Sequence, residues 1–209
     1  MYHKAKRHFK KTDPILFAAA NDIDIEDVKV SDDLFRDIVW TITGQQLSSL
    51  AANAIFARFQ ELFKRKSITP KRILALKEED MRAAGLSGAK VRAIKNVAEV
   101  VQKGHLNIKL LPTLKDDEIV DELTKVKGIG PWTAQMLLMF SLCRPDVFSL
   151  GDLGLRKGIV QLYGLRKLPA EKRLAKLINQ WSPYRTYAAR VLWKVADKKT
   201  ARIARKRPA

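Results

Sequence analysis

The sequence is poor in cysteine, and this scarcity removes several classes of protein. Cys143 is the only cysteine among 209 residues. A disulfide within the chain and any zinc or iron–sulfur site built on four cysteines are therefore excluded. The three histidines, His3, His8 and His105, are scattered without the spacing of metal ligands. Neither a phosphate-binding loop nor a dinucleotide fingerprint is present, so no nucleotide cofactor is expected.

Long apolar runs are also missing. No stretch of about 18 consecutive apolar residues occurs, so we expect no membrane-spanning helix. The basic N-terminus, Met1–Arg7, is not followed by the apolar core of a secretory signal. We therefore expect an intracellular protein in a reducing compartment.

Acidic residues are scarce relative to basic ones. The chain holds 40 Lys and Arg against 22 Asp and Glu, a formal net charge of +18. About +14 of this charge lies between Arg156 and the C-terminus. Such an excess predicts a polyanionic partner, either nucleic acid or an anionic membrane surface. A generally basic, solvated surface is the alternative, but the clustering favours a binding face.

Sustained strand-like alternation is absent, whereas helical spacing of apolar residues recurs throughout the chain. The pattern predicts about ten helices and an all-α fold. Residues 1–12 are expected to be frayed at the start, and residues 198–209 to form a basic tail that is disordered until it meets a polyanion. Helices are expected at Pro14–Ala20, Leu34–Thr43, Gln45–Phe59, around Ile73, at Glu78–Gly85, Ala89–Val101, Ile119–Leu123, Pro131–Phe140 and Leu155–Tyr163, after Pro169, and from Trp181 to Val195.

One stretch stands out as a candidate site. Val126–Gly130 reads Val-Lys-Gly-Ile-Gly, a turn that glycine makes easily, and Pro131 suits the first turn of a following helix. Two helices joined in this way present backbone N–H groups and a positive helix end to one point, which is a phosphate-binding arrangement. A plain connector is the alternative. About twenty residues later Asp152 stands at an expected helix start, where an N-cap is the simplest role.

Four blocks of the sequence resemble a known family. They read TGQQLSSLAANAIFARF, VKGIGPWTAQMLLMF, DVFSLGDLGLRKG and WSPYRTYAARVLWK. In this order they are similar to the helix-hairpin-helix DNA glycosylases, and most closely to the 3-methyladenine DNA glycosylase branch. The resemblance implies two all-helical subdomains that flank a DNA-binding cleft. One would comprise residues 34–144 with the hairpin, and the other residues 1–33 together with 145–197.

The resemblance also implies a reaction. Alkylated purines such as 3-methyladenine and 7-methylguanine would be excised from duplex DNA, which initiates base excision repair. Asp152 would be the catalytic residue, because a carboxylate stabilises an oxocarbenium-like sugar and orients the attacking water. An alkylated purine already carries positive charge, so no general acid is needed. Bifunctional relatives place a Schiff-base lysine where this chain has Trp132, so we expect a monofunctional enzyme without lyase activity.

A cationic base is recognised well by aromatic faces. By the resemblance Trp132 and Trp193 match pocket aromatics, and Tyr184 is a weaker candidate. Met136 stands where some relatives carry an aromatic residue, which leaves the range of excised bases open. A core position is the alternative for each aromatic.

Further contacts with DNA are implied by the same family. A flipped base leaves a gap that a side chain must fill, and the candidates for this wedge are Gln46, Leu47 and Ser48. The alternative is an exposed helix start. The backbone N–H groups of Gly128, Gly130 and Thr133 would bind a phosphate. The carbonyls of Thr124, Val126 and Ile129 would hold a Na⁺ or K⁺ ion.

No other cofactor and no iron–sulfur cluster are expected. The partner would be double-stranded DNA with alkylated bases, bound by a monomer in the cytoplasm or nucleoid, or in a nucleus. Two other functions are compatible with the residues. One is a non-catalytic DNA-binding module in which Asp152 is only a cap. The other is a glycosylase of the same superfamily that acts on mismatched or oxidised bases.

Overall fold

The computed structural model of the protein describes the backbone of residues 1–205 and the side chains of residues 1–197. This part of the chain contains twelve α-helices and one 3₁₀-helix and no strand, so the predicted all-α fold is confirmed. No helix in it is both long and apolar enough to cross a membrane. The helices are α1 (Tyr2–Thr12), α2 (Pro14–Asn21), α3 (Leu34–Gly44), α4 (Ser49–Glu61), α5 (Pro70–Ala75), α6 (Glu78–Ala83), α7 (Gly88–Gln102), η1 (Ile108–Thr113), α8 (Asp116–Thr124), α9 (Pro131–Phe140), α10 (Leu153–Leu162), α11 (Glu171–Asn179) and α12 (Arg185–Arg205).

The chain divides into two compact units. The hairpin unit is the continuous segment Lys29–Leu142. The terminal unit combines Met1–Val28 with the chain from Cys143 onward. The sequence-based boundaries, after residues 33 and 144, lie a few residues further along the chain.

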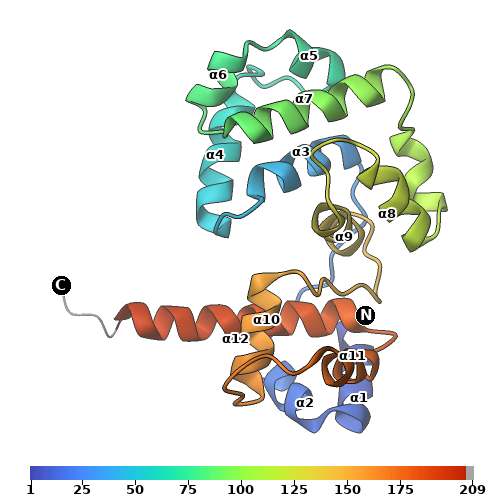
Figure 1. The fold of residues 1–209 in the computed structure, drawn as a ribbon, viewed down its shortest axis with the longest axis vertical. Coiled ribbons are helices and arrows are strands. Elements are labelled where there is room, and N and C mark those ends of the chain that lie inside the picture. Colours follow the sequence, from blue (N-terminus) through green and yellow to red (C-terminus); the bar gives the residue numbers. More distant parts are fainter. Residues whose placement is uncertain (206–209) are drawn as a thin grey trace. The chain divides into compact units, whose positions relative to one another are not determined.

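The hairpin unit is built around α3. This helix packs against α4, α7 and α9, while α5 and α6 contact α7 and α8 contacts α9. In Figure 1, α3 lies between α7 and α9. Apolar residues at helical spacing face the interior, among them Ile38 and Ile42 of α3, Ile94 of α7 and Leu137 of α9, all at most 1% exposed. Their burial supplies most of the stability of such a unit.

The terminal unit is organised by the long helix α12. Helix α10 crosses α12 (Figure 1), and α2 packs against both. The crossing is close because Gly158 of α10 has no side chain. A Cβ there would lie 2.4 Å from the carbonyl oxygen of Leu192 in α12. Glycine at this position therefore lets the two helix backbones touch.

The expected fraying of residues 1–12 is wrong, because Tyr2–Thr12 form helix α1. Tyr2, Ala5 and Phe9 recur at helical spacing and are buried, and the Tyr2 hydroxyl donates hydrogen bonds to the carbonyls of Ala20 and Ile23. Basic residues occupy most of the remaining positions of the helix. The sequence-based prediction gave weight to these basic residues and missed the short apolar stripe, which is enough to pack the helix against the rest of the unit.

Two other helix boundaries differ from expectation. Helix α4 begins at Ser49, not Gln45, because Gln46 adopts a φ of 58° and the Ser48 hydroxyl caps the helix at the N–H of Ala51. Helix α12 continues past Val195 to Arg205. Residues 196–205 contain no glycine or proline and are rich in Ala, Lys and Arg, which favour helix. The expected disorder of the tail, residues 198–209, stays a prediction, and residues 206–209 lie outside the described residues.

Candidate functional site

The helix-hairpin-helix motif lies in the hairpin unit. Helix α8 ends at Thr124, and α9 begins at Pro131 with Gly130 as its N-cap. Between them Val126 and Ile129 turn inward and are buried, whereas Lys127 and Gly128 are exposed. This alternation anchors the turn on two apolar side chains and leaves its polar backbone outside.

Gly128 is required for this turn. Its φ is +104°, which other residues rarely adopt, and a Cβ there would lie 2.4 Å from the Cβ of Ala93 in α7. Gly130 has ordinary backbone angles, and an added Cβ would meet no atom within 4 Å. The first glycine is therefore needed for folding, while the second leaves open space at the helix start.

The first two turns of α9 carry three of the predicted residues. Trp132 is half-buried in this turn, and Thr133 beside it is buried. The first N–H groups of any helix lack intrahelical acceptors, and together they form the positive end of the helix. Met136, one turn later, is 6% exposed and belongs to the core of the hairpin unit.

The loop between α3 and α4 is tied to the hairpin by a residue that the sequence did not single out. The Gln45 side-chain amide donates to the Thr133 hydroxyl at 2.9 Å and to the Gly128 carbonyl at 3.3 Å. The predicted wedge residues Gln46, Leu47 and Ser48 follow directly and are exposed. They therefore directly follow a residue that is hydrogen-bonded to the hairpin turn of the same unit.

The sequence analysis also did not name a second exposed leucine near this loop. Leu50, in the first turn of α4, is 84% exposed, against 39% for Leu47. Some DNA-binding proteins insert exposed apolar side chains between base steps. Leu47 and Leu50 are thus both available as wedges.

The three carbonyls predicted to hold a cation lie at the C-terminal end of α8 and in the turn. The Val126 carbonyl accepts a hydrogen bond from the Ile129 N–H at 3.0 Å. The Thr124 hydroxyl donates to the Val120 carbonyl at 2.8 Å. Thr124 is the last residue of α8, so its carbonyl is among the last ones of the helix. Carbonyl oxygens at the negative end of a helix suit a small cation.

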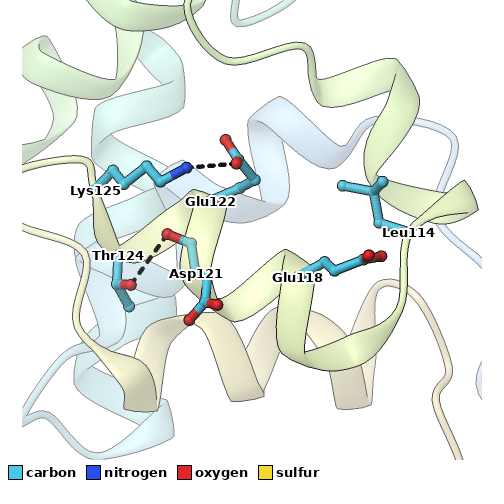
Figure 2. Close-up of a pocket in the computed structure, with 6 residues that line it drawn as sticks. All are labelled: Leu114, Glu118, Asp121, Glu122, Thr124 and Lys125. Carbon is cyan, nitrogen blue, oxygen red and sulfur yellow. Dashed lines mark hydrogen bonds and ion pairs between the residues drawn. The ribbon is translucent and has the colours of Figure 1, made fainter.

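A cavity of about 590 Å³ opens on this side of the hairpin unit (Figure 2). It is lined by Leu114, Glu118, Asp121, Glu122, Thr124 and Lys125. Figure 2 shows the Lys125 ammonium paired with Glu122 at 2.6 Å. Three acidic side chains against one lysine would repel a phosphate, and no aromatic residue lines the wall. This cavity does not match the pocket expected for a base.

Asp152 lies in the terminal unit and is the N-cap of α10. Its Oδ1 accepts from the Leu155 N–H at 2.8 Å, as the simplest interpretation of the sequence predicted. The same Oδ1 accepts from the indole N–H of Trp193, also at 2.8 Å. Both side chains are partly exposed. The structure therefore brings together two predicted residues that are 41 positions apart.

The surroundings of this pair are close-packed on one side and apolar on the other. A Cβ at Gly154 would lie 2.8 Å from Cδ1 of Trp193 and 3.0 Å from Oδ1 of Asp152. Leu153, which follows the aspartate, is 68% exposed, and Leu150 is 49% exposed. Asp152 thus has the Trp193 indole against it and exposed leucines nearby in the sequence.

Tyr184 is not placed with this pair. It directly precedes α12, and its ring lies 5.5 Å from that of His8 in α1. Nine residues separate it from Trp193, which corresponds to about 14 Å along a helix axis. Its assignment to the base pocket remains a prediction with no supporting contact to Asp152.

A glycine-containing hairpin between two helices, followed by a capping and partly exposed aspartate in an all-helical chain, defines a helix-hairpin-helix protein. The chain belongs to the HhH-GPD superfamily of base excision DNA repair proteins, whose sequence profile matches residues 39–183.

Comparison with individual relatives shows which branch of the superfamily the chain resembles. DNA-3-methyladenine glycosylase 1 of Schizosaccharomyces pombe is 38% identical over 169 residues, which cover 78% of this chain and 72% of that protein. The solved structure of the S. pombe 3-methyladenine DNA glycosylase Mag1 with abasic DNA matches with a TM-score of 0.81 and 33% identity, over 91% of this chain and 95% of that one. A DNA-3-methyladenine glycosidase of Bacillus halodurans gives a TM-score of 0.75 and 34% identity, over 93% and 91% of the two chains. The resemblance to the 3-methyladenine branch is confirmed.

Proposed function

We propose that the protein is a monofunctional DNA N-glycosylase that releases alkylated purines, of the 3-methyladenine and 7-methylguanine type, from duplex DNA. The observation that carries the proposal is Asp152, a partly exposed residue at a helix start whose carboxylate is held by the Leu155 N–H and the Trp193 indole N–H. Family membership and the names of the relatives support the same activity.

Asp152 acts on the sugar. Cleavage of the N-glycosidic bond builds positive charge at C1′ and on the ring oxygen, and an ionised carboxylate beside them lowers the energy of this state. The donors at Leu155 and Trp193 fix the orientation of the carboxylate. We propose that this carboxylate faces the sugar or the attacking water when DNA is bound.

The alkylated base leaves as a neutral purine because it was already cationic. The chain therefore needs one acid, and Asp152 supplies it. Trp132, at the position of the Schiff-base lysine in bifunctional relatives, cannot form an imine. We expect base release to produce an abasic site without strand cleavage.

Trp193 has a second role besides that of a pocket aromatic. Its N–H is directed at the carboxylate at 2.8 Å, so the ring is fixed edge-on to Asp152. An electron-rich ring so close to the carboxylate also favours a cationic base. We propose that Trp193 both orients Asp152 and borders the base.

Duplex DNA is the proposed partner. The exposed turn at Lys127 and Gly128 and the start of α9 would bind a backbone phosphate. Leu47, or its neighbours Gln46 and Ser48, would enter the gap left by the flipped nucleotide. The carbonyls of Thr124, Val126 and Ile129 would hold a Na⁺ or K⁺ ion that supplies positive charge next to that phosphate. We propose a DNA-associated monomer of the nucleoid or nucleus.

The test is release of free base from a duplex that contains one 7-methylguanine. We expect Asp152→Asn to lower the single-turnover rate by at least about 100-fold. An asparagine can still accept from Leu155 and Trp193, so the fold is kept. The matched control is Asp33→Asn, since Asp33 caps α3 in the same way, through the Arg36 N–H at 3.0 Å.

Other outcomes would select another function. Equal release by wild type and Asp152→Asn would end the assignment of the catalytic residue. Salt-dependent binding without release would indicate a DNA-binding module. Release from oxidised or mismatched duplexes alone would indicate another glycosylase of the superfamily.

A further inference from the structure

The segment that delivers Asp152 contains no helix, yet it is held tightly. It runs from Cys143 to Gly151, between the hairpin unit and α10. Asp146 lies in the middle of it. The Arg185 guanidinium, at the start of α12, donates from Nε to Oδ1 of Asp146 at 2.8 Å and from Nη2 to Oδ2 at 3.0 Å. This two-pronged pairing fixes orientation as well as distance.

Two more groups complete the attachment of Asp146. The Arg185 backbone N–H donates to Oδ1 at 3.2 Å, and the Ser182 hydroxyl donates to Oδ2 at 2.8 Å. Burial opposes the ionisation of Asp146, but the hydrogen bonds from Arg185 and Ser182 outweigh it and hold the pKa of this carboxyl below its ordinary value of 3.8. The pair is therefore charged at neutral pH.

Thr186, the next residue of α12, binds the backbone of the same segment. Its hydroxyl donates to the Arg144 carbonyl at 2.7 Å and accepts from the Val147 N–H at 3.0 Å. Its own N–H donates to the Pro145 carbonyl at 3.0 Å. Thr186 is 3% exposed, so these bonds are shielded from water. Residues 144–147 are thus attached to the first turn of α12.

The far end of the segment is attached to the same helix. Trp193 of α12 donates to Asp152, and Gly158 of α10 lies against Leu192. Arg185 and Trp193 are eight residues apart, about 12 Å along the helix axis. The single helix α12 therefore fixes the position of both the start of the segment and Asp152 at its far end.

We infer that Arg185 is a positioning residue for Asp152, acting through its fork to Asp146. The inference rests on the proposed glycosylase function. Without the fork, the segment keeps its attachments at Thr186 and Trp193, but Asp146 loses the two-pronged pairing that fixes its orientation, so the path into α10 is held less tightly. The carboxylate then samples positions in which it no longer faces the sugar. Displacements of about 1 Å at a reacting group lower rates by up to about 100-fold.

The experiment compares Arg185→Gln with wild type in the full chain. We expect the single-turnover rate of 7-methylguanine release to fall by about 10- to 100-fold, while the Kd for duplex with an abasic-site analogue changes less than about twofold. Arg185→Lys keeps the charge without the fork and should lose most of the same rate. It also serves if Arg185→Gln does not fold.

The matched control is Tyr187→Phe. Tyr187 lies on the same helix, two residues from Arg185, and its hydroxyl donates at 3.0 Å to Asp27, which is not part of the segment. This control should lose some thermal stability but retain the release rate. If both variants lose rate in proportion to their loss of Tm, Arg185 acts through stability alone and the inference is overturned.

Amide hydrogen exchange separates this inference from the proposed function, because it needs no activity. Arg185→Gln should accelerate exchange in residues 144–152 more than in α10, and Tyr187→Phe should not. Unchanged exchange would overturn the attachment, and faster exchange with a normal release rate would overturn the positioning role. A wild-type protein that releases no base would refute the proposed function and the positioning role with it, whereas the exchange data would still decide the attachment.

Discussion

The two units differ in their content of charged residues and in the role of those residues. The terminal unit has 22 basic and 9 acidic residues, and the hairpin unit has 18 and 13. The proposed phosphate site nevertheless lies in the less basic hairpin unit, where it consists of backbone groups, the neutral side chain of Gln45 and the hydroxyl of Thr133. In the terminal unit the few carboxylates are the points at which elements are joined.

Asp13 illustrates this use of carboxylates. It caps α2 through the Leu16 N–H at 3.0 Å and also accepts from Gln180 Nε2 at 2.9 Å, Trp181 Nε1 at 2.8 Å and the Tyr163 hydroxyl. It is 4% exposed. Burial, together with the hydrogen bond to Asp13, raises the pKa of Tyr163, so its hydroxyl remains a donor. Asp33 caps α3 at the corresponding position of the hairpin unit through the Arg36 N–H.

The comparison shows that an aspartate at a helix N-cap has different roles in different surroundings. A carboxylate at a solvent-facing cap satisfies its own helix. A buried one must satisfy its whole charge with donors, and so it connects every element that supplies them. In the terminal unit this applies to Asp13, and in part to the half-buried Asp146 and Asp152.

The largest effect is expected for Asp13→Ala. The substitution leaves the donors of Tyr163, Gln180 and Trp181 without this acceptor, which should lower the free energy of unfolding by about 3–5 kcal/mol. The control, Asp33→Ala, removes only a cap and should cost about 1 kcal/mol. Urea unfolding measures both. Equal losses would contradict the contrast between the two caps.

The second effect concerns the two hairpin glycines. Gly128→Ala combines a φ of +104° with a contact 2.4 Å from Ala93 and should lower the free energy of unfolding by about 2–3 kcal/mol. Gly130→Ala meets open space and should leave stability nearly unchanged. If the backbone of Gly130 approaches a phosphate, its variant should still bind duplex DNA more weakly, which fluorescence anisotropy would reveal. A stable Gly128→Ala protein would show that the turn can rearrange.

The smallest effect is expected for Trp193→Phe, which keeps an aromatic ring but removes the donor to Asp152. A hydrogen bond to a charged group contributes about 1.5 kcal/mol or more, so base release should slow by about tenfold. Trp40→Phe in α3 is the control outside the terminal unit, and its release rate should be normal. A normal rate for Trp193→Phe with a slow rate for Trp193→Leu would assign the role to the ring and not to the N–H.

Local signals in the sequence predicted much of this molecule. Glycine, proline and cap residues act on their immediate neighbours, so the turn at 126–130, the start of α9 and the cap at Asp152 could be inferred before the fold was known. The pairs between distant positions could not. Asp146 and Arg185 are 39 residues apart, and Gln45 and Thr133 are 88 apart. Only the packing of helices brings them together.

The missed helix α1 has a related cause. Its three buried residues, Tyr2, Ala5 and Phe9, form a narrow stripe among lysines and arginines. Taken alone, such a peptide is a weak helix in water. Contact with the rest of the terminal unit stabilises it, and this contact is invisible in the local sequence.

The spacing of eight residues between Arg185 and Trp193 has one more consequence. Because both lie on one uninterrupted helix, their relative direction is set by the helical twist, about 100° for each residue. Deleting or inserting a single residue between them would rotate the indole about the axis by that angle and turn it away from the aspartate. Side chains on the outer face of this interval can vary in identity, but the number of residues in it cannot.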